Sequence, residues 1–284
     1  MMISSKTLIL LTFVPLSIFS CAKKEKHKEK EIPEETTTVL KLPYDFENPS
    51  QKITLPKSLK EISGLSFYKN NQLACINDEE GKVFIFDLTK KEISDKIPFG
   101  KSGDYEGVEV VDNEVFVLRS DGLIKSFKIG EPFEREIDCS DPDVIEYEGL
   151  SYDPTTGNLL LAAKERIKDV DNKKMIYAYD FKRKILFKSI AIPDEKLIGK
   201  DGKKTFRPSG IAIHPITQQV FIIASQGKKL LILSKDGAKE ALVDLNPNLY
   251  KQPEGICFTP NGNLYISSEG AGGDGYILAF DYKK

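Results

Sequence analysis

The 284-residue sequence predicts an all-β fold, a five-bladed β-propeller in which each blade has four strands. A short motif, a glutamate or serine followed by glycine and an alternating apolar run, occurs five times. Successive motif glycines are separated by 43, 42, 61 and 45 residues, close to the period of about 40–45 that is typical of propeller blades. Each motif opens a series of strand-like segments of 5–8 residues that are rich in Val, Ile, Phe and Tyr.

The first 20 residues have the pattern of a signal peptide. A short segment with one lysine precedes an apolar run over 7–20, which is too short for a membrane-spanning helix. The run ends in Ile18-Phe19-Ser20-Cys21, which resembles a bacterial lipobox. The resemblance implies cleavage before Cys21 and diacylation of its sulfur. The alternative is an ordinary signal peptide with a coincidental cysteine.

Residues 21–37 are charged and almost free of large apolar side chains, so we expect a disordered tether between the lipid and a propeller domain at 38–284. Acyl chains on Cys21 would give stable anchoring to the membrane. The expected location is therefore the bacterial cell envelope. Because Ala22 rather than an aspartate follows the cysteine, the outer membrane or the cell surface is favoured over the inner membrane.

The four segments of a blade are clear in the first repeat, at 62–68, 72–78, 82–88 and 92–99. The fifth repeat stops after three segments, at 253–260, 263–270 and 275–282. A bare sheet edge is avoided if an N-terminal segment, 51–56 or 37–43, supplies the fourth strand and closes the ring. The long third interval contains polar insertions at 164–174 and 193–207, and a sixth, degenerate blade there is the alternative.

Composition limits the classes of partner. The net charge of −2 gives no reason to expect a nucleic-acid partner, and we expect a monomer. Cys75 and Cys257 lie in apolar strand-like runs and are expected to be buried free thiols. Neither a C-x-x-C motif nor a cluster of Cys and His is present, which disfavours a zinc site.

The repeats resemble a known family. The segments ISGLSF, YEGVEV, RPSGIAIHP and QPEGICFTPNGNLYISSEG, together with the long stretch from 133 to 165, are similar to the SdiA-regulated family of bacterial β-propellers. The resemblance covers about residues 50–284. It implies a soluble propeller on the outside of a membrane and carries no established activity.

Propeller topology predicts where a site would lie. The first strand of each blade begins, and the second ends, at the same face. This rim should gather the residues before the motif glycines with residues that end the second strands. The candidate binding residues are Ser63, Glu106, Glu148, Ser209, Glu254, Arg119, Lys164 and Glu269.

Three glutamates near one axis repel each other, and an unpaired buried carboxylate is costly. Arg119 and Lys164 could pair with the glutamates, or neighbouring-blade amides could donate hydrogen bonds to them. A third possibility is a hard cation, Ca²⁺ or Mg²⁺, held by Glu106, Glu148 and Glu254.

The favoured function is a lipid-anchored binding or scaffolding module that recognises a small polar or cationic ligand, or an envelope protein, at this rim. The alternative is a calcium-dependent hydrolase of the lactonase or phosphoesterase type at the same rim. The sequence has no G-x-S-x-G or H-E-x-x-H motif, and His214 has the position of a strand-end residue. No catalytic residue is therefore assigned.

Overall fold

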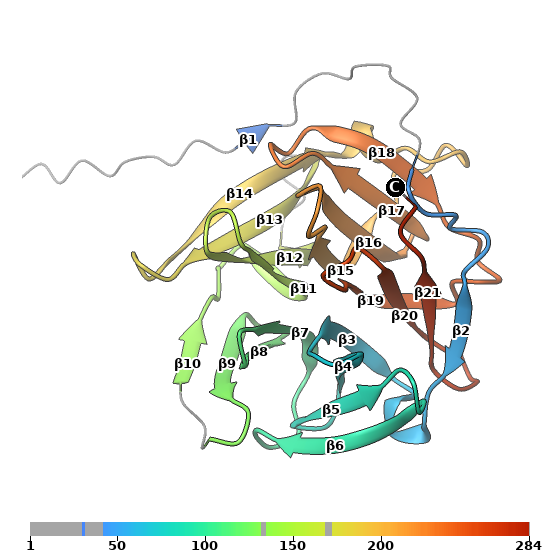
Figure 1. Ribbon diagram of the computed structural model, residues 1–284. Coiled ribbons are helices and arrows are strands. Elements are labelled where there is room, and N and C mark those ends of the chain that lie inside the picture. The colour runs from blue at the N-terminus through green and yellow to red at the C-terminus, as the bar shows by residue number, and fades with distance from the viewer. Residues whose placement is uncertain (1–29, 32–41, 132–134, 168–171, 284) are drawn as a thin grey trace, which may run out of the picture.

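Five antiparallel sheets surround a common axis in the computed structural model, which describes residues 30–31, 42–131, 135–167 and 172–283 (Figure 1). Each sheet is one blade, and its first strand lies innermost. The fold is therefore the predicted five-bladed propeller. The only helical elements of the described chain are two short 3₁₀ helices, η1 (Lys57–Leu59) and η2 (Asp194–Leu197).

The blades follow one another in chain order. Blade one contains β3 (Ile62–Phe67), β4 (Gln72–Asn77), β5 (Lys82–Asp87) and β6 (Glu92–Pro98). Blade two contains β7 (Tyr105–Val111), β8 (Glu114–Arg119), β9 (Leu123–Lys128) and β10 (Arg135–Asp138). Blade three contains β11 (Val144–Asp153), β12 (Asn158–Arg166), β13 (Lys173–Asp180) and β14 (Ile185–Pro193). Blade four contains β15 (Arg207–Ile213), β16 (Val220–Gln226), β17 (Lys229–Leu233) and β18 (Lys239–Asp244).

Blade five combines both ends of the domain. It contains β19 (Gln252–Phe258), β20 (Leu264–Glu269), β21 (Tyr276–Phe280) and, as its outer strand, β2 (Gln51–Thr54). β2 lies beside β21 (Figure 1). The two strands pair antiparallel, with Ile53 opposite Ile277. Of the two segments that could close the ring, the one at 51–56 does so, and the segment 37–43 lies almost entirely outside the described residues.

The sixth blade considered for the third interval is wrong. Part of the extra length lies in the strands of blade three, since β11, β12 and β14 have 10, 9 and 9 residues. The rest lies in the loop that contains η2. The two ends of the polar stretch at 164–174 belong to strands, since 164–166 continue β12 and 173–174 begin β13. Of the predicted signal peptide and tether, only β1 (Lys30–Glu31) is described, and it pairs parallel with β14.

Apolar side chains fill the space between neighbouring blades. Phe221 and Ile223 of blade four, for example, share one cluster with Phe258 and Ile266 of blade five. The inner strand β3 is buried along most of its length, whereas the outer strand β6 of the same blade is largely exposed. Cys75 and Cys257 are buried free thiols, as predicted, and so is Cys139.

The motif glycines allow the inner strands to come close together. A Cβ atom on Gly210 would lie 2.4 Å from the carbonyl oxygen of Glu254 in the next blade, and one on Gly255 would lie 2.8 Å from the backbone nitrogen of Leu65. A Cβ atom on the equivalent glycines Gly64, Gly107 or Gly149 would likewise lie 2.8–3.2 Å from atoms of the following blade. Any side chain at these positions would push blades apart.

A shift in strand register accompanies every motif. The ladder between the first and second strands skips the residue before the glycine in blades one to four, as between Tyr105 and Gly107 and between Pro208 and Gly210. In blade five it skips both Glu254 and Gly255. Such a bulge leaves one residue outside the regular pairing and changes the direction of its side chain. In this ring the skipped residues include all five predicted rim positions.

The chain segment before β2 is fastened to the opposite face of blades four and five. The Tyr44 hydroxyl donates to the Gly262 carbonyl at 2.6 Å and lies 2.8 Å from Nε2 of His214. Nδ1 of His214 accepts hydrogen bonds from the backbone N–H groups of Ile216 and Thr217. His214 therefore caps a turn after β15, as its strand-end position predicts, and its two ring nitrogens are both used.

Candidate functional site

The rim at the start of the inner strands contains a narrow opening and a wider pocket. Ser63, Glu106, Glu148 and Ser209 line a constriction on the axis with a free volume of about 10 Å³, about enough for one water molecule or ion. Beside it, a pocket of about 450 Å³ opens over blades three, four and five. Its walls are formed by Glu148, Lys164, Arg207, Ser225, Gln226, Gly227, Lys228, Gln252 and Glu254.

Two glutamates of β11 share one lysine. The Lys164 ammonium lies 2.9 Å from an oxygen of Glu146 and also forms an ion pair with Glu148. Burial raises the pKa of Glu148 to about 7, even though the hydrogen bond and charge of Lys164 act to lower it. Burial also disfavours the charged form of Lys164, but its two glutamate partners outweigh burial and raise its pKa.

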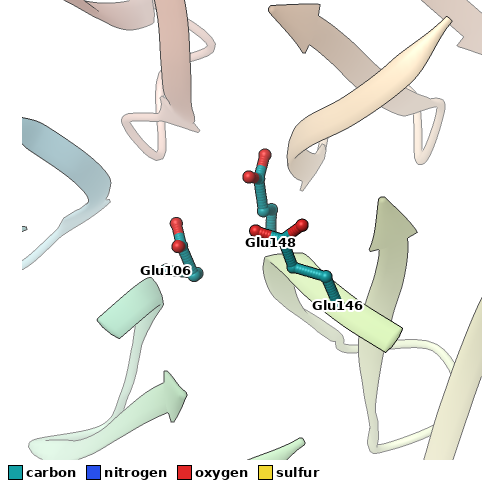
Figure 2. A group of neighbouring side chains, drawn as sticks. All are labelled: Glu106, Glu146 and Glu148. Carbon is teal, nitrogen blue, oxygen red and sulfur yellow. The ribbon is translucent and has the colours of Figure 1, made fainter. Parts of the chain in front are cut away.

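Glu106 has a different environment on the facing strand. Its carboxylate makes no hydrogen bond or ion pair to the part of the chain that the structure describes. Burial, followed by the charge of Glu148, raises the pKa of Glu106 to about 9. One oxygen each of Glu106, Glu146 and Glu148 lie within 4.8 Å of one another, and the side chains meet near the axis (Figure 2). The third carboxylate of this cluster is Glu146, whereas Glu254 lines the neighbouring pocket.

Glu254 is 9% exposed. It accepts a hydrogen bond of 3.1 Å from the Ser225 hydroxyl of blade four, and the Gln252 side chain donates a second hydrogen bond. Burial and then the charge of Glu148 raise the pKa of Glu254 well above its ordinary value. Among the described residues no lysine or arginine lies within ion-pairing distance of it, so a negative charge on Glu254 is uncompensated at close range.

Arg207 and Lys228 are two further basic side chains in the pocket wall. Arg207 pairs with Glu165 at 2.9 Å. Lys228 donates to the Ser225 carbonyl at 3.0 Å, and burial lowers its pKa in spite of the opposing effect of Glu254. Within the described chain, no carboxylate forms an ion pair with Lys228, so the pocket presents charges of both signs.

The predicted site residues lie in four places. Glu106, Glu148, Ser63 and Ser209 meet at the constriction, and Lys164 and Glu254 line the pocket. Glu269 ends β20 at the same rim, where burial and the charges of Asp78 and Glu61 raise its pKa to about 7. Arg119 does not pair with the axial glutamates. Its guanidinium binds both carboxylate oxygens of the exposed Asp121, at 2.9 and 2.6 Å.

Hydrogen bonds do join blades at the rim, but not in the predicted form. The donors to Glu254 are side chains rather than backbone amides, and the Ser209 hydroxyl donates to the Pro253 carbonyl of the next blade at 2.7 Å. The serine of the motif is therefore the inter-blade connector in blade four.

Sequence reasoning missed Glu146, Arg207, Gln252 and Lys228. Glu146 had a usable signal, because it lies two residues before Glu148 and alternate residues of a strand point to the same side. Gln252 likewise lies two residues before Glu254. Lys228 is in the turn after β16, and no periodicity identifies it.

The fold and this rim define a propeller whose axial opening is lined by serine and carboxylate side chains. The model of the SdiA-regulated family matches residues 41–271, and the chain belongs to that family. No curated protein sequence matches the chain. No helix within the described residues has the length and apolar character needed to cross a membrane.

Solved structures share the fold at low sequence identity. Glutaminyl cyclase of Myxococcus xanthus is 14% identical with a TM-score of 0.58, over 83% of this chain and 96% of that chain. The PQQ-bound aldose sugar dehydrogenase of Streptomyces coelicolor is 16% identical with a TM-score of 0.53, over 82% and 97%. The nidogen/laminin complex gives 14% identity and a TM-score of 0.50, over 73% and 72%. The similar chains thus include enzymes and a binding protein, and the likeness extends to the fold alone.

Proposed function

We propose that the protein is a binding module whose rim pocket takes a small polar ligand that carries a positively charged group. The observation that carries the proposal is Glu254, a carboxylate buried at the pocket wall without a cationic partner among the described residues. A ligand ammonium or guanidinium group at this position would supply the missing charge in an environment where charge-assisted hydrogen bonds are strong.

The size and lining of the pocket support a small ligand. Its volume of about 450 Å³ lies within the range of about 300–1,000 Å³ that is usual for small-molecule sites. Arg207 and Lys228 lie in the same wall and can donate hydrogen bonds to oxygen atoms of the ligand. A molecule with an amine at one end and oxygen acceptors at the other matches both halves of the pocket.

The proposal is tested by thermal unfolding of the purified full-length chain with defined probes. Putrescine and L-lysine carry amines, citrate is anionic, and glucose is neutral. We expect the two amines to raise the melting temperature in a concentration-dependent way and the other two compounds to have no effect. Burial raises the pKa of Glu254 well above its ordinary value, so proton loss must accompany binding and amine affinity should rise with pH.

Variants locate the binding. Glu254→Gln keeps the shape of the side chain and should abolish the response to amines. Glu92→Gln, an exposed glutamate on the outer strand β6, makes the same charge change away from the rim and should leave the response intact. An equal response of both variants, or stabilisation by citrate alone, would contradict the proposal.

A calcium-dependent hydrolase is the second candidate. It is favoured by the close approach of Glu106, Glu146 and Glu148 and by the pKa of Glu148 near 7, which suits a group that exchanges protons at neutral pH. Hydrolysis of lactones or phosphoesters that is lost in Glu148→Gln would establish this function. If neither substrate panel is hydrolysed while amine binding is intact, the hydrolase is excluded and the binding module is retained.

We also propose that the chain is anchored to the cell envelope through lipid on Cys21, a residue outside the described part of the chain. The support is the apolar run and the lipobox-like sequence before this cysteine. Mass spectrometry of the N-terminal peptide should show acyl chains on Cys21, and Cys21→Ala should release the protein from membranes. An unmodified cysteine in membrane-bound protein would contradict this assignment.

A further inference from the structure

A second pocket lies on the axis at the mouth opposite the rim, where the inner strands of all five blades end. This far pocket has a volume of about 250 Å³, and every blade contributes to its wall, through Phe67, Glu109, Ser151, Pro215 and Phe258 among others. The constriction near the rim has a free volume of only about 10 Å³, so an organic molecule in the far pocket cannot reach the rim pocket along the axis. The two pockets are therefore separate sites.

The wall of the far pocket is mostly apolar, unlike that of the rim pocket. It includes three prolines that follow the inner strands of blades three, four and five, namely Pro154, Pro215 and Pro260. Aromatic side chains of three blades, Phe67, Tyr152 and Phe258, line the same pocket. None of the described residues that line the rim pocket has an apolar side chain. The far pocket can therefore bury an apolar body, which the rim pocket cannot.

Glu109 places a carboxylate in this apolar wall, where residues of three blades hold it. One of its oxygens accepts hydrogen bonds from the Ser66 hydroxyl at 3.0 Å and from the backbone N–H of Val110 at 3.2 Å. The Ser151 side chain and the backbone N–H of Tyr152 donate two more hydrogen bonds to the carboxylate. All four donors are neutral, and within the described chain no lysine or arginine lies within ion-pairing distance of Glu109. The direction of the carboxylate is thus fixed, while its charge is uncompensated at close range.

An unpaired charge is unfavourable in these surroundings. Burial raises the pKa of Glu109 to about 7, although its four hydrogen bonds act to lower it. A cation from outside the protein would compensate the carboxylate, because charge-assisted hydrogen bonds are stronger than neutral ones and an apolar wall strengthens them further. Aromatic faces also attract cations, and three aromatic side chains lie in the same wall. The lining thus combines groups that recognise an ammonium with groups that bury an apolar body.

We propose that the far pocket binds a compact organic ammonium compound, whose apolar body packs against the proline and aromatic rings while its charged head pairs with Glu109. A cavity of about 150 Å³ is enough for benzene. The far pocket, with about 250 Å³, therefore has room for one ring and a short aminoalkyl group. The site is independent of the function proposed for the rim, where the ligand is polar and its partner is Glu254.

Three benzyl compounds that share one ring test the choice of head group. Benzylamine is cationic, benzyl alcohol is neutral and benzoate is anionic. Calorimetric titration into the purified full-length chain should show that benzylamine binds about tenfold or more tightly than benzyl alcohol and that benzoate does not bind. Thermal melts with each compound should give the same order of stabilisation. Equal binding of the amine and the alcohol, a preference for benzoate, or no binding of benzylamine would overturn the proposal.

Variants of the two pockets locate the binding. Glu109→Gln keeps the shape of the side chain, and its amide oxygen can still accept the hydrogen bonds from Ser66 and Val110. This variant should weaken benzylamine binding by about tenfold and leave putrescine binding unchanged. Glu254→Gln should do the reverse. Benzylamine binding that is kept in Glu109→Gln and lost in Glu254→Gln would place the amine at the rim and overturn the far site.

Phe67→Ala is a second variant, which keeps the carboxylate and removes one aromatic ring from the wall. It should weaken benzylamine binding several-fold, and it decides the question if circular dichroism shows that Glu109→Gln does not fold. Unchanged affinity in Phe67→Ala would contradict binding in the far pocket. A failure of putrescine to bind the wild-type chain would bear on the rim alone, because none of the benzyl measurements depends on it.

Discussion

Gly210→Ala tests how the ring of blades controls the site. The added Cβ would lie 2.4 Å from the Glu254 carbonyl oxygen, and 3.1 Å from Cγ2 of Ile256. An ordinary contact begins at about 3.4 Å, so the backbones of blades four and five must separate by about 1 Å. Overpacking of this kind costs about 1–3 kcal/mol. Because the obstacle is a backbone atom that cannot rotate away, we expect the upper end of that range.

A loss of about 3 kcal/mol corresponds to a fall of roughly 6–12 °C in the melting temperature of a domain of this size. The chain has no tryptophan, so urea and thermal unfolding are followed by far-UV circular dichroism. The same displacement moves Glu254 and the hydrogen bond from Ser209 to Pro253, so the response to amine probes should fall as well.

Gly273→Ala is the matched control. Gly273 is exposed, and a Cβ there meets nothing closer than 3.5 Å, so this variant should unfold within about 1 kcal/mol of wild type. A Gly210→Ala protein with unchanged stability would refute the reasoning, because it would mean that the blades can separate at no cost.

Two further predictions concern buried polar groups. Burial lowers the pKa of His214 from 6.5 to about 4. The unfolded chain therefore takes up this proton first, and we expect about 2–3 kcal/mol of stability to be lost as pH falls from 6.5 to 4. His214→Asn should show a flatter pH profile in urea unfolding, and an identical slope would count against the assignment. Lys229 is 1% exposed and donates to the carbonyls of Leu197, Lys203 and Thr205. Lys229→Met should cost about 2–4 kcal/mol and speed proteolysis within 194–206, unlike the exposed control Lys235→Met.

The architecture could be predicted because each sequence repeat corresponds to one blade. Each inner strand needs a glycine where it meets the next blade, so five glycines at blade spacing define five blades. The truncated fifth repeat left a single missing strand, and the pattern before the first repeat offered two segments for it, of which 51–56 contains β2. The sixth blade was considered because the third interval is long. Part of that length lies in polar extensions of β12 and β13, which resemble an inserted loop in the sequence.

The candidate site was only partly predictable. Topology placed the residue before each glycine at the rim, which is why Glu106, Glu148 and Ser63 could be selected from the sequence. Whether a long side chain reaches those residues depends on its rotamer and on its nearest neighbour. Arg119 ends β8 and Lys164 lies two residues before the end of the equivalent strand β12, yet Arg119 binds the nearby Asp121 whereas Lys164 pairs with two glutamates.

The sequence by itself determined the class of fold, the number of blades and the ring of positions that face the axis, because these follow from a periodic pattern of glycine and apolar residues. Only the tertiary structure decided which charges are compensated. A bulge before each glycine changes the direction of the motif side chain, which then faces the axis. Packing between the blades decides which charged side chains lie close enough to pair with it. Lys164 consequently serves Glu146 and Glu148, while Glu106 and Ser63 face the constriction without a partner in the described structure.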